Sequence, residues 1–79
     1  MLTSAEIRAT TFTVTRWREG YDKAEVDAFL ARLALAVDTH STITPMEIVN
    51  ARFQPTRLRE GYNQNQVDNF LDRIVESLK

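Results

Sequence analysis

One segment of this 79-residue chain occurs twice. Residues 15–30 read TRWREGYDKAEVDAFL, and residues 56–71 read TRLREGYNQNQVDNFL. A shift of 41 residues aligns the two halves without a gap and matches positions outside these segments as well. A repeated unit in so short a chain is typical of a supersecondary unit that cannot bury its apolar face alone. We therefore expect two repeats, at residues 1–38 and 44–79, joined by a hinge at residues 39–43.

Each repeat has the pattern of a short helix, a loop and a long helix. Capping boxes, which mark helix starts, occur twice in each repeat: TSAE at 3–6, DKAE at 22–25, TPME at 44–47 and NQNQ at 63–66. Apolar residues then recur at helical spacing: Val26, Phe29, Leu30 and Leu33, and again Val67, Phe70, Leu71 and Ile74. The pattern predicts an all-α fold in which the repeats form an internal pseudo-dimer. The long helices would pack antiparallel within one chain or exchange between two chains.

The composition limits the classes of function. Ten basic and eleven acidic residues give a net charge of −1, so no basic surface suggests nucleic-acid binding. No apolar run reaches the ~20 residues of a membrane-spanning helix, and the N-terminus does not read as a signal peptide. There is no cysteine, which fits a reducing cytoplasm. We expect a cytoplasmic protein whose membrane contact, if any, is peripheral.

Catalytic chemistry has no candidate residues in this sequence. His40 is the only histidine, and it lies in the hinge, where we expect an exposed linker residue. The two glycines are isolated, so there is no glycine-rich phosphate loop, and there is no thiol nucleophile. The sequence therefore predicts no enzyme, no cofactor, no metal and no small-molecule substrate.

Four pairs of matched positions are interpreted as structural. We expect Gly20 and Gly61 to adopt positive φ where each loop turns into its long helix. An aromatic residue midway between two helices usually fills the gap between them, and a ring just before an N-cap can pack onto the helix that follows. A carboxylate beside an apolar stripe can accept hydrogen bonds from the preceding loop or pair with an arginine. We expect the first of these roles for Phe12 and Phe53, which would fill the gap, and the second for Tyr21 and Tyr62, which precede the N-caps. The third is expected for the carboxylates of Asp27 and Asp68, with Arg16 or Arg57 as the arginine partner.

The loops leave one question open. A large apolar residue lies between two arginines in each: Arg16, Trp17 and Arg18 in the first repeat, Arg57, Leu58 and Arg59 in the second. Each apolar residue would either fold under its loop and cover the core, or project from the loop tip. A projecting residue could enter a lipid surface while the arginines meet anionic phosphates, or anchor a protein partner. Glu19 and Glu60 partly neutralise the loops.

These elements resemble the N-terminal domain of the DivIVA family of bacterial cell-division and polar-growth scaffolds. The resemblance rests on Gly20-Tyr21-Asp22 followed by residues 26–30 (VDAFL), and on Gly61-Tyr62-Asn63 followed by residues 67–71 (VDNFL). It implies a non-catalytic scaffold at the inner face of the membrane, at septa or poles, that recruits division or cell-wall proteins. By position, Trp17 with Arg18 and Leu58 with Arg59 would insert into lipid. The family's long coiled coil has no counterpart here.

The resulting hypothesis is a DivIVA-like scaffold or adaptor module linked to cell division or envelope growth. Its partners would be a protein or a second copy of the chain, together with an anionic membrane surface. Two alternatives stay open: a module that binds protein or itself without lipid contact, and, more distantly, a small helical nucleic-acid binder.

Overall fold

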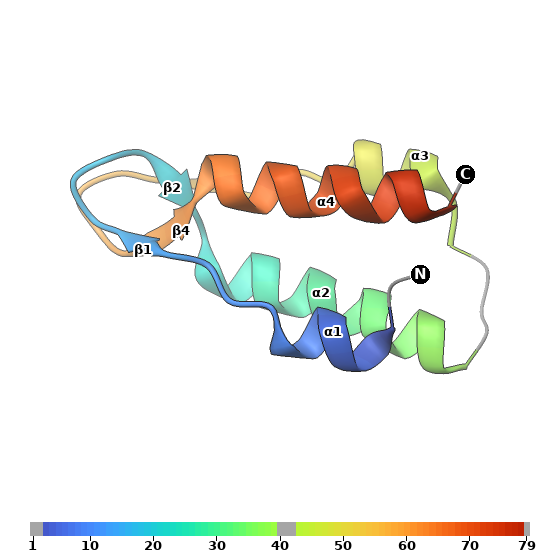
Figure 1. Cartoon of the computed structure of the whole chain (residues 1–79). Helices are drawn as coiled ribbons and strands as arrows, with labels where there is room; N and C mark the ends of the chain where they lie inside the picture. Colours follow the sequence, from blue (N-terminus) through green and yellow to red (C-terminus); the bar gives the residue numbers. More distant parts are fainter. Residues whose placement is uncertain (1–2, 40–42, 79) are drawn as a thin grey trace.

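The computed structural model describes residues 3–39 and 43–78. It contains four helices and four short strands in these ranges: α1 (Ser4–Ala9), β1 (Val14–Thr15), β2 (Gly20–Tyr21), α2 (Lys23–Asp38), α3 (Pro45–Val49), β3 (Pro55–Thr56), β4 (Gly61–Asn63) and α4 (Gln64–Leu78). The strands form one antiparallel sheet at one end of the molecule, and α2 and α4 both begin there and run away from it (Figure 1). The described part of the chain measures 38 × 22 × 16 Å.

The expectation of an all-α fold is wrong, because the loops form a four-stranded sheet and the fold is mixed α/β. The expectation of antiparallel long helices is also wrong. Figure 1 shows that α3 and the loop after it carry the chain back to the sheet, so α4 starts where α2 starts. The two long helices therefore run in the same general direction.

The helix starts follow the capping patterns only in part. As expected, the side chains of Thr3, Asp22, Thr44 and Asn63 accept hydrogen bonds from the backbone N–H three residues later. In the long helices, however, the side chain of the last residue of the box does not reach back to its own cap. Glu25 Oε1 accepts from the N–H of Gln54 at 2.6 Å, and Gln66 Oε1 accepts from the N–H of Thr13 at 2.7 Å. Each long helix thus holds the loop of the other repeat.

The sheet is built by exchange between the repeats. Its strand order is β1-β4-β2-β3, so each outer strand pairs with an inner strand of the other repeat. At the centre β2 pairs with β4, and Tyr21 lies opposite its own counterpart Tyr62. β1 pairs with β4 so that Val14 lies opposite Tyr62. β3 pairs with β2 in the equivalent register, with Pro55 opposite Tyr21. The two repeats are therefore related by a pseudo-two-fold axis between the tyrosines.

The core lies between the helices of both repeats. Each short helix contributes one buried residue, and each long helix contributes one face; the ten residues are Ile7, Val26, Leu30, Leu33, Ala34, Ile48, Val67, Phe70, Leu71 and Ile74. Because they form one cluster, neither repeat has a core of its own. This is the burial that a single repeat cannot achieve.

The expectation that Gly20 and Gly61 adopt positive φ is wrong. Both positions require glycine because the strands pack closely there. Neither Gly20 nor Gly61 has a positive φ. A Cβ on Gly61 would lie 2.1 Å from Oγ1 of Thr56 and 2.8 Å from the carbonyl oxygen of Tyr21. On Gly20 it would lie 2.8 Å from the carbonyl oxygen of Tyr62. The crossing strands approach each other so closely that no side chain fits at either site.

We predict that Gly61→Ala destabilises the fold by about 3 kcal/mol and Gly20→Ala by about 1 kcal/mol, within the range for overpacking. The larger effect is expected at Gly61 because Thr56, which its Cβ would meet, is buried at 1% exposure and cannot move aside. Urea unfolding followed by circular dichroism measures both variants, each serving as the matched control for the other. Equal midpoints, or a Gly61→Ala midpoint equal to that of the parent, would contradict this account.

Candidate functional site

Two loop tips carry the most exposed large apolar side chains among the described residues. We call residues 16–19 the Trp17 tip and residues 57–60 the Leu58 tip. Trp17 is 83% exposed and Leu58 is 73% exposed, so neither folds under its loop to cover the core. Both tips project from the sheet end of the molecule (Figure 1). The sequence left open whether these residues fold under their loops or project from them, and their exposure shows that they project.

The backbone of the Leu58 tip is strained. Leu58 has a φ of 62°, a left-handed conformation that costs a residue other than glycine roughly 1–3 kcal/mol. No other described non-glycine residue has a positive φ. The rest of the fold therefore stabilises a loop shape that presents this leucine to solvent.

Both glutamates of the loops are engaged by residues of the other repeat. Glu60 bridges Arg16 and Lys23, each at 2.8 Å, and the bonds to Lys23 and then Arg16 lower the pKa of its carboxyl. The counterpart of Glu60, Glu19, lies 3.8 Å from Arg57. These exposed pairs are individually weak, but they link the tips to each other. They also mean that Arg16 and Arg57 pair with these glutamates and not with Asp27 or Asp68.

The second arginine of each tip differs between the repeats. Arg59 lies 3.6 Å from the carboxylate of Asp22. The position equivalent to Asp22 is Asn63, which has no charge, and Arg18 has no ion pair or hydrogen bond among the described residues. The Trp17 tip therefore carries the larger apolar side chain and an uncompensated cation.

Behind the tips, each repeat is attached to the long helix of the other by a tyrosine. The hydroxyl of Tyr21 donates to Asp68 at 2.8 Å, and that of Tyr62 donates to Asp27 at 2.7 Å. The aspartates do accept hydrogen bonds, as expected, but from the opposite repeat and not from their own preceding loop. The tyrosines were expected to pack onto the helices that they precede, but their hydroxyls bind the long helix of the opposite repeat.

The loop phenylalanines also pack across the pseudo-two-fold axis. Phe12 contacts the rings of Tyr62 and Phe70, with centroids 5.3 and 5.9 Å apart. Phe53 contacts Tyr21 and Phe29 at 5.4 and 5.7 Å. Both phenylalanines are half-buried against the core. They do not fill the gap between the helices of their own repeat, because the loop carries each ring into the other repeat.

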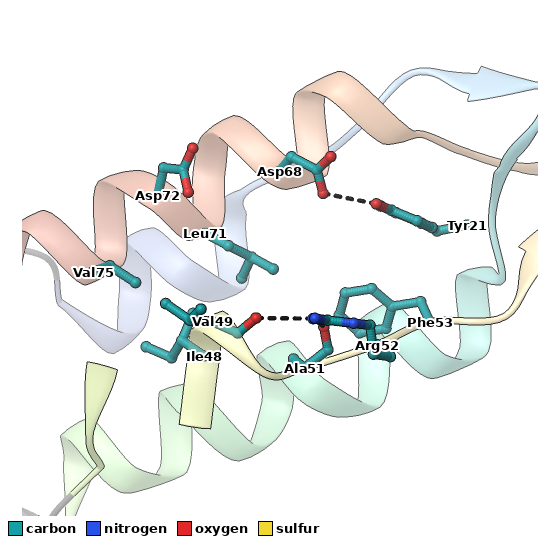
Figure 2. A pocket seen from close by; sticks show the side chains of 10 residues that line it. All are labelled: Tyr21, Ile48, Val49, Ala51, Arg52, Phe53, Asp68, Leu71, Asp72 and Val75. Atoms are coloured by element: carbon teal, nitrogen blue, oxygen red, sulfur yellow. Dashed lines mark hydrogen bonds between the residues drawn. The ribbon is translucent and has the colours of Figure 1, made fainter. Parts of the chain in front are cut away.

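A second candidate site, the α3–α4 groove, was not expected from the sequence. It has a volume of about 430 Å³ and is lined by Tyr21, Ile48, Val49, Ala51, Arg52, Phe53, Asp68, Leu71, Asp72 and Val75 (Figure 2). Arg52 donates to the backbone carbonyls of Val49 and Ala51, both at 2.9 Å. Asp72 has no hydrogen bond or ion pair among the described residues. The signal in the sequence is that several lining positions differ from their counterparts, among them Val49, Arg52 and Asp72, which correspond to Arg8, Thr11 and Ala31.

Other candidate chemistry is limited. Within residues 3–39 and 43–78, no three His, Asp or Glu side chains lie close enough together to hold a metal ion. The same ranges contain no helix with the length and apolar character needed to cross a bilayer. His40, expected to be an exposed linker residue, lies outside the described residues.

We predict that both tyrosines titrate well above their ordinary pKa of 10.0. Burial, followed by the hydrogen bond to Asp68, raises the pKa of Tyr21 to about 12. The hydrogen bond to Asp27, followed by burial, raises the pKa of Tyr62 to about 12. The folded state thus favours the protonated hydroxyls, so their stabilising contribution is complete below pH 10.0 and is lost as the pH rises towards 12.

The ultraviolet absorbance of tyrosinate checks this prediction, with unfolding measured at each pH. Asp68→Asn should lower the pKa of Tyr21 only, and Asp27→Asn that of Tyr62 only, because each amide removes one negative charge beside one hydroxyl. A parent protein in which both tyrosines titrate near 10 while still folded would contradict the hydrogen-bonded geometry.

Comparisons of the chain with protein-family models, with curated proteins and with solved structures find no match. The functional interpretation therefore rests on the geometry of the loop tips and the groove, together with the resemblance of the GYD and VDxFL segments.

Proposed function

We propose that this chain is a non-catalytic, DivIVA-like scaffold or adaptor module that binds the inner face of the bacterial membrane in cell division or envelope growth. One observation supports it above the others. The two loop tips lie at the same end of the pseudo-symmetric body (Figure 1), and each has an exposed apolar residue, Trp17 or Leu58, between two arginines. In this proposal both tips contact the same membrane surface.

The physical chemistry of the tips fits an anionic lipid surface. An indole ring prefers the boundary between headgroups and acyl chains because it is largely apolar but carries one N–H donor. Each basic residue near an anionic surface contributes about 1 kcal/mol. Glu19 and Glu60 oppose this attraction less than their charge suggests, because each lies beside a cation of the other repeat. Single tips would bind weakly, and their covalent linkage raises the overall affinity.

The second candidate function is a protein-binding module without lipid contact. The open α3–α4 groove favours it, since a hollow lined by both apolar and charged side chains is typical of a docking site. Trp and Arg are also the residue types that most often dominate protein interfaces. The two candidates differ in whether the tips respond to lipid.

Trp17, the only tryptophan, reports on its own tip. We predict red-shifted emission in buffer, a blue shift on adding vesicles of anionic phospholipid, and co-sedimentation of the protein with them. Neutral vesicles and high salt should weaken both effects, because salt screens the arginine–phosphate attraction. An emission spectrum unchanged by anionic vesicles, with the protein left in the supernatant, would exclude the membrane proposal and favour the protein-binding module.

Arginine variants test which tip dominates. We expect Arg18→Ala to lower vesicle affinity about fivefold, the equivalent of about 1 kcal/mol. Arg59→Ala is the matched control and should have a smaller effect, because Arg59 is already paired with Asp22. Equal losses, measured by the same fluorescence titration, would show that the ion pair does not distinguish the tips.

A further inference from the structure

The hollow beside the short helix differs between the two repeats. In the first repeat, Ser4 and Arg8 of α1 both hydrogen-bond to Asp38 at the end of α2. The counterparts of Ser4 and Arg8 are Pro45 and Val49, which provide no such bonds to α4. The equivalent hollow beside α1 is smaller, at about 350 Å³, and has Arg8 in its lining where the groove has Val49.

The groove is also more acidic than its counterpart, and one of its apolar side chains is exposed. Val49 remains 57% exposed on its wall. On α4, Asp72 and Val75 occupy the positions that are Ala31 and Ala34 on α2. Asp68 and Asp72 lie one helical turn apart, and both line the groove, as Figure 2 shows. The single cation of the lining, Arg52, is directed at two backbone carbonyls, so the carboxylate of Asp72 has no partner within residues 3–39 and 43–78.

The Trp17 tip has the complementary chemistry. It presents an indole that is 83% exposed, next to Arg18, which is unpaired among the described residues. An apolar wall with an unpaired carboxylate matches an apolar ring with an unpaired guanidinium in both respects. The volume of about 430 Å³ is enough for one indole side chain.

We infer that the α3–α4 groove binds the Trp17 tip of a second copy of this chain, with Arg18 against Asp72. The tip lies at the sheet end of the molecule (Figure 1), whereas the groove is lined by residues of α3, of α4 and of the segment after α3 (Figure 2). The contact therefore joins two different surfaces, and a pair of bound copies still offers one free groove and one free Trp17 tip. Such a heterologous contact extends into open chains unless its rotation closes a ring.

This inference goes beyond the proposed membrane contact and competes with it, because a tip seated in a groove cannot enter lipid. It is tested without lipid, so that its failure and that of the membrane proposal are separate results. One side chain and one ion pair bury much less than the ~1,000 Å² of a stable interface. We therefore expect association with a Kd on the order of 0.1–1 mM, weakened by salt.

Sedimentation equilibrium gives the first measurement. The mass of the parent should rise above the 9.1 kDa of a single chain between about 0.01 and 1 mM. Trp17→Ser and Asp72→Arg should each weaken this association by about tenfold or more. The matched controls are the equivalent positions of the other repeat, Leu58→Ser and Ala31→Arg, and both should associate as the parent does. A parent that stays at the single-chain mass over this range would overturn the inference.

Mixing the two defective variants gives the sharper test. Trp17→Ser keeps its groove and Asp72→Arg keeps its tip, so together they should form a one-to-one complex of twice the single-chain mass that grows no further. The only tryptophan in the mixture then belongs to the Asp72→Arg chain, and its emission should shift to the blue on mixing. Circular dichroism checks that both variants are folded, as expected for exposed positions. Folded variants that do not combine, or that associate as well as the parent, would overturn the inference.

Discussion

The antiparallel pairing of β2 with β4, centred on Tyr21 and Tyr62, is the contact on which the rest of the structure depends. Two-residue strands are too short to be stable alone, so this pairing persists only because other contacts surround it. Each tyrosine is fixed by a phenylalanine and an aspartate of the opposite repeat. The glycines next to the tyrosines let the strands approach closely enough to cross.

The crossing explains why the tips lie together. Each loop leaves its own short helix, pairs through its outer strand with an inner strand of the other repeat and returns through the central strands, so both turns emerge at the sheet end (Figure 1). The loop backbones are held there by Glu25 and Gln66 of the opposite repeat. The exposure of Trp17 and Leu58 is therefore a product of the pairing between repeats, and loss of that pairing would change both tips at once.

The helices could be predicted from the sequence and the sheet could not. Helix starts are local signals, and Thr3, Asp22, Thr44 and Asn63 accept the expected hydrogen bonds. Strands of two or three residues carry no alternating pattern, and their partners lie about one repeat away along the chain. For the same reason the aspartates, tyrosines and phenylalanines were placed within their own repeats. The residues of the tips were identified from the sequence, whereas the groove was missed because it depends on how far α3 lies from α4.

The covalent link between the repeats has a consequence for how such a protein can change by mutation. In a homodimer of identical halves, every substitution appears on both sides of the symmetry axis, so a surface cannot be altered on one side alone. Here the two sides are encoded separately. Many residues that make contacts across the axis are identical in both halves, including Phe12 and Phe53, Gly20 and Gly61, and Asp27 and Asp68. Away from the axis, the second half has Val49 and Asp72 at the positions where the first half has Arg8 and Ala31. Duplication thus lets one half retain the shared framework while the other acquires a surface of its own.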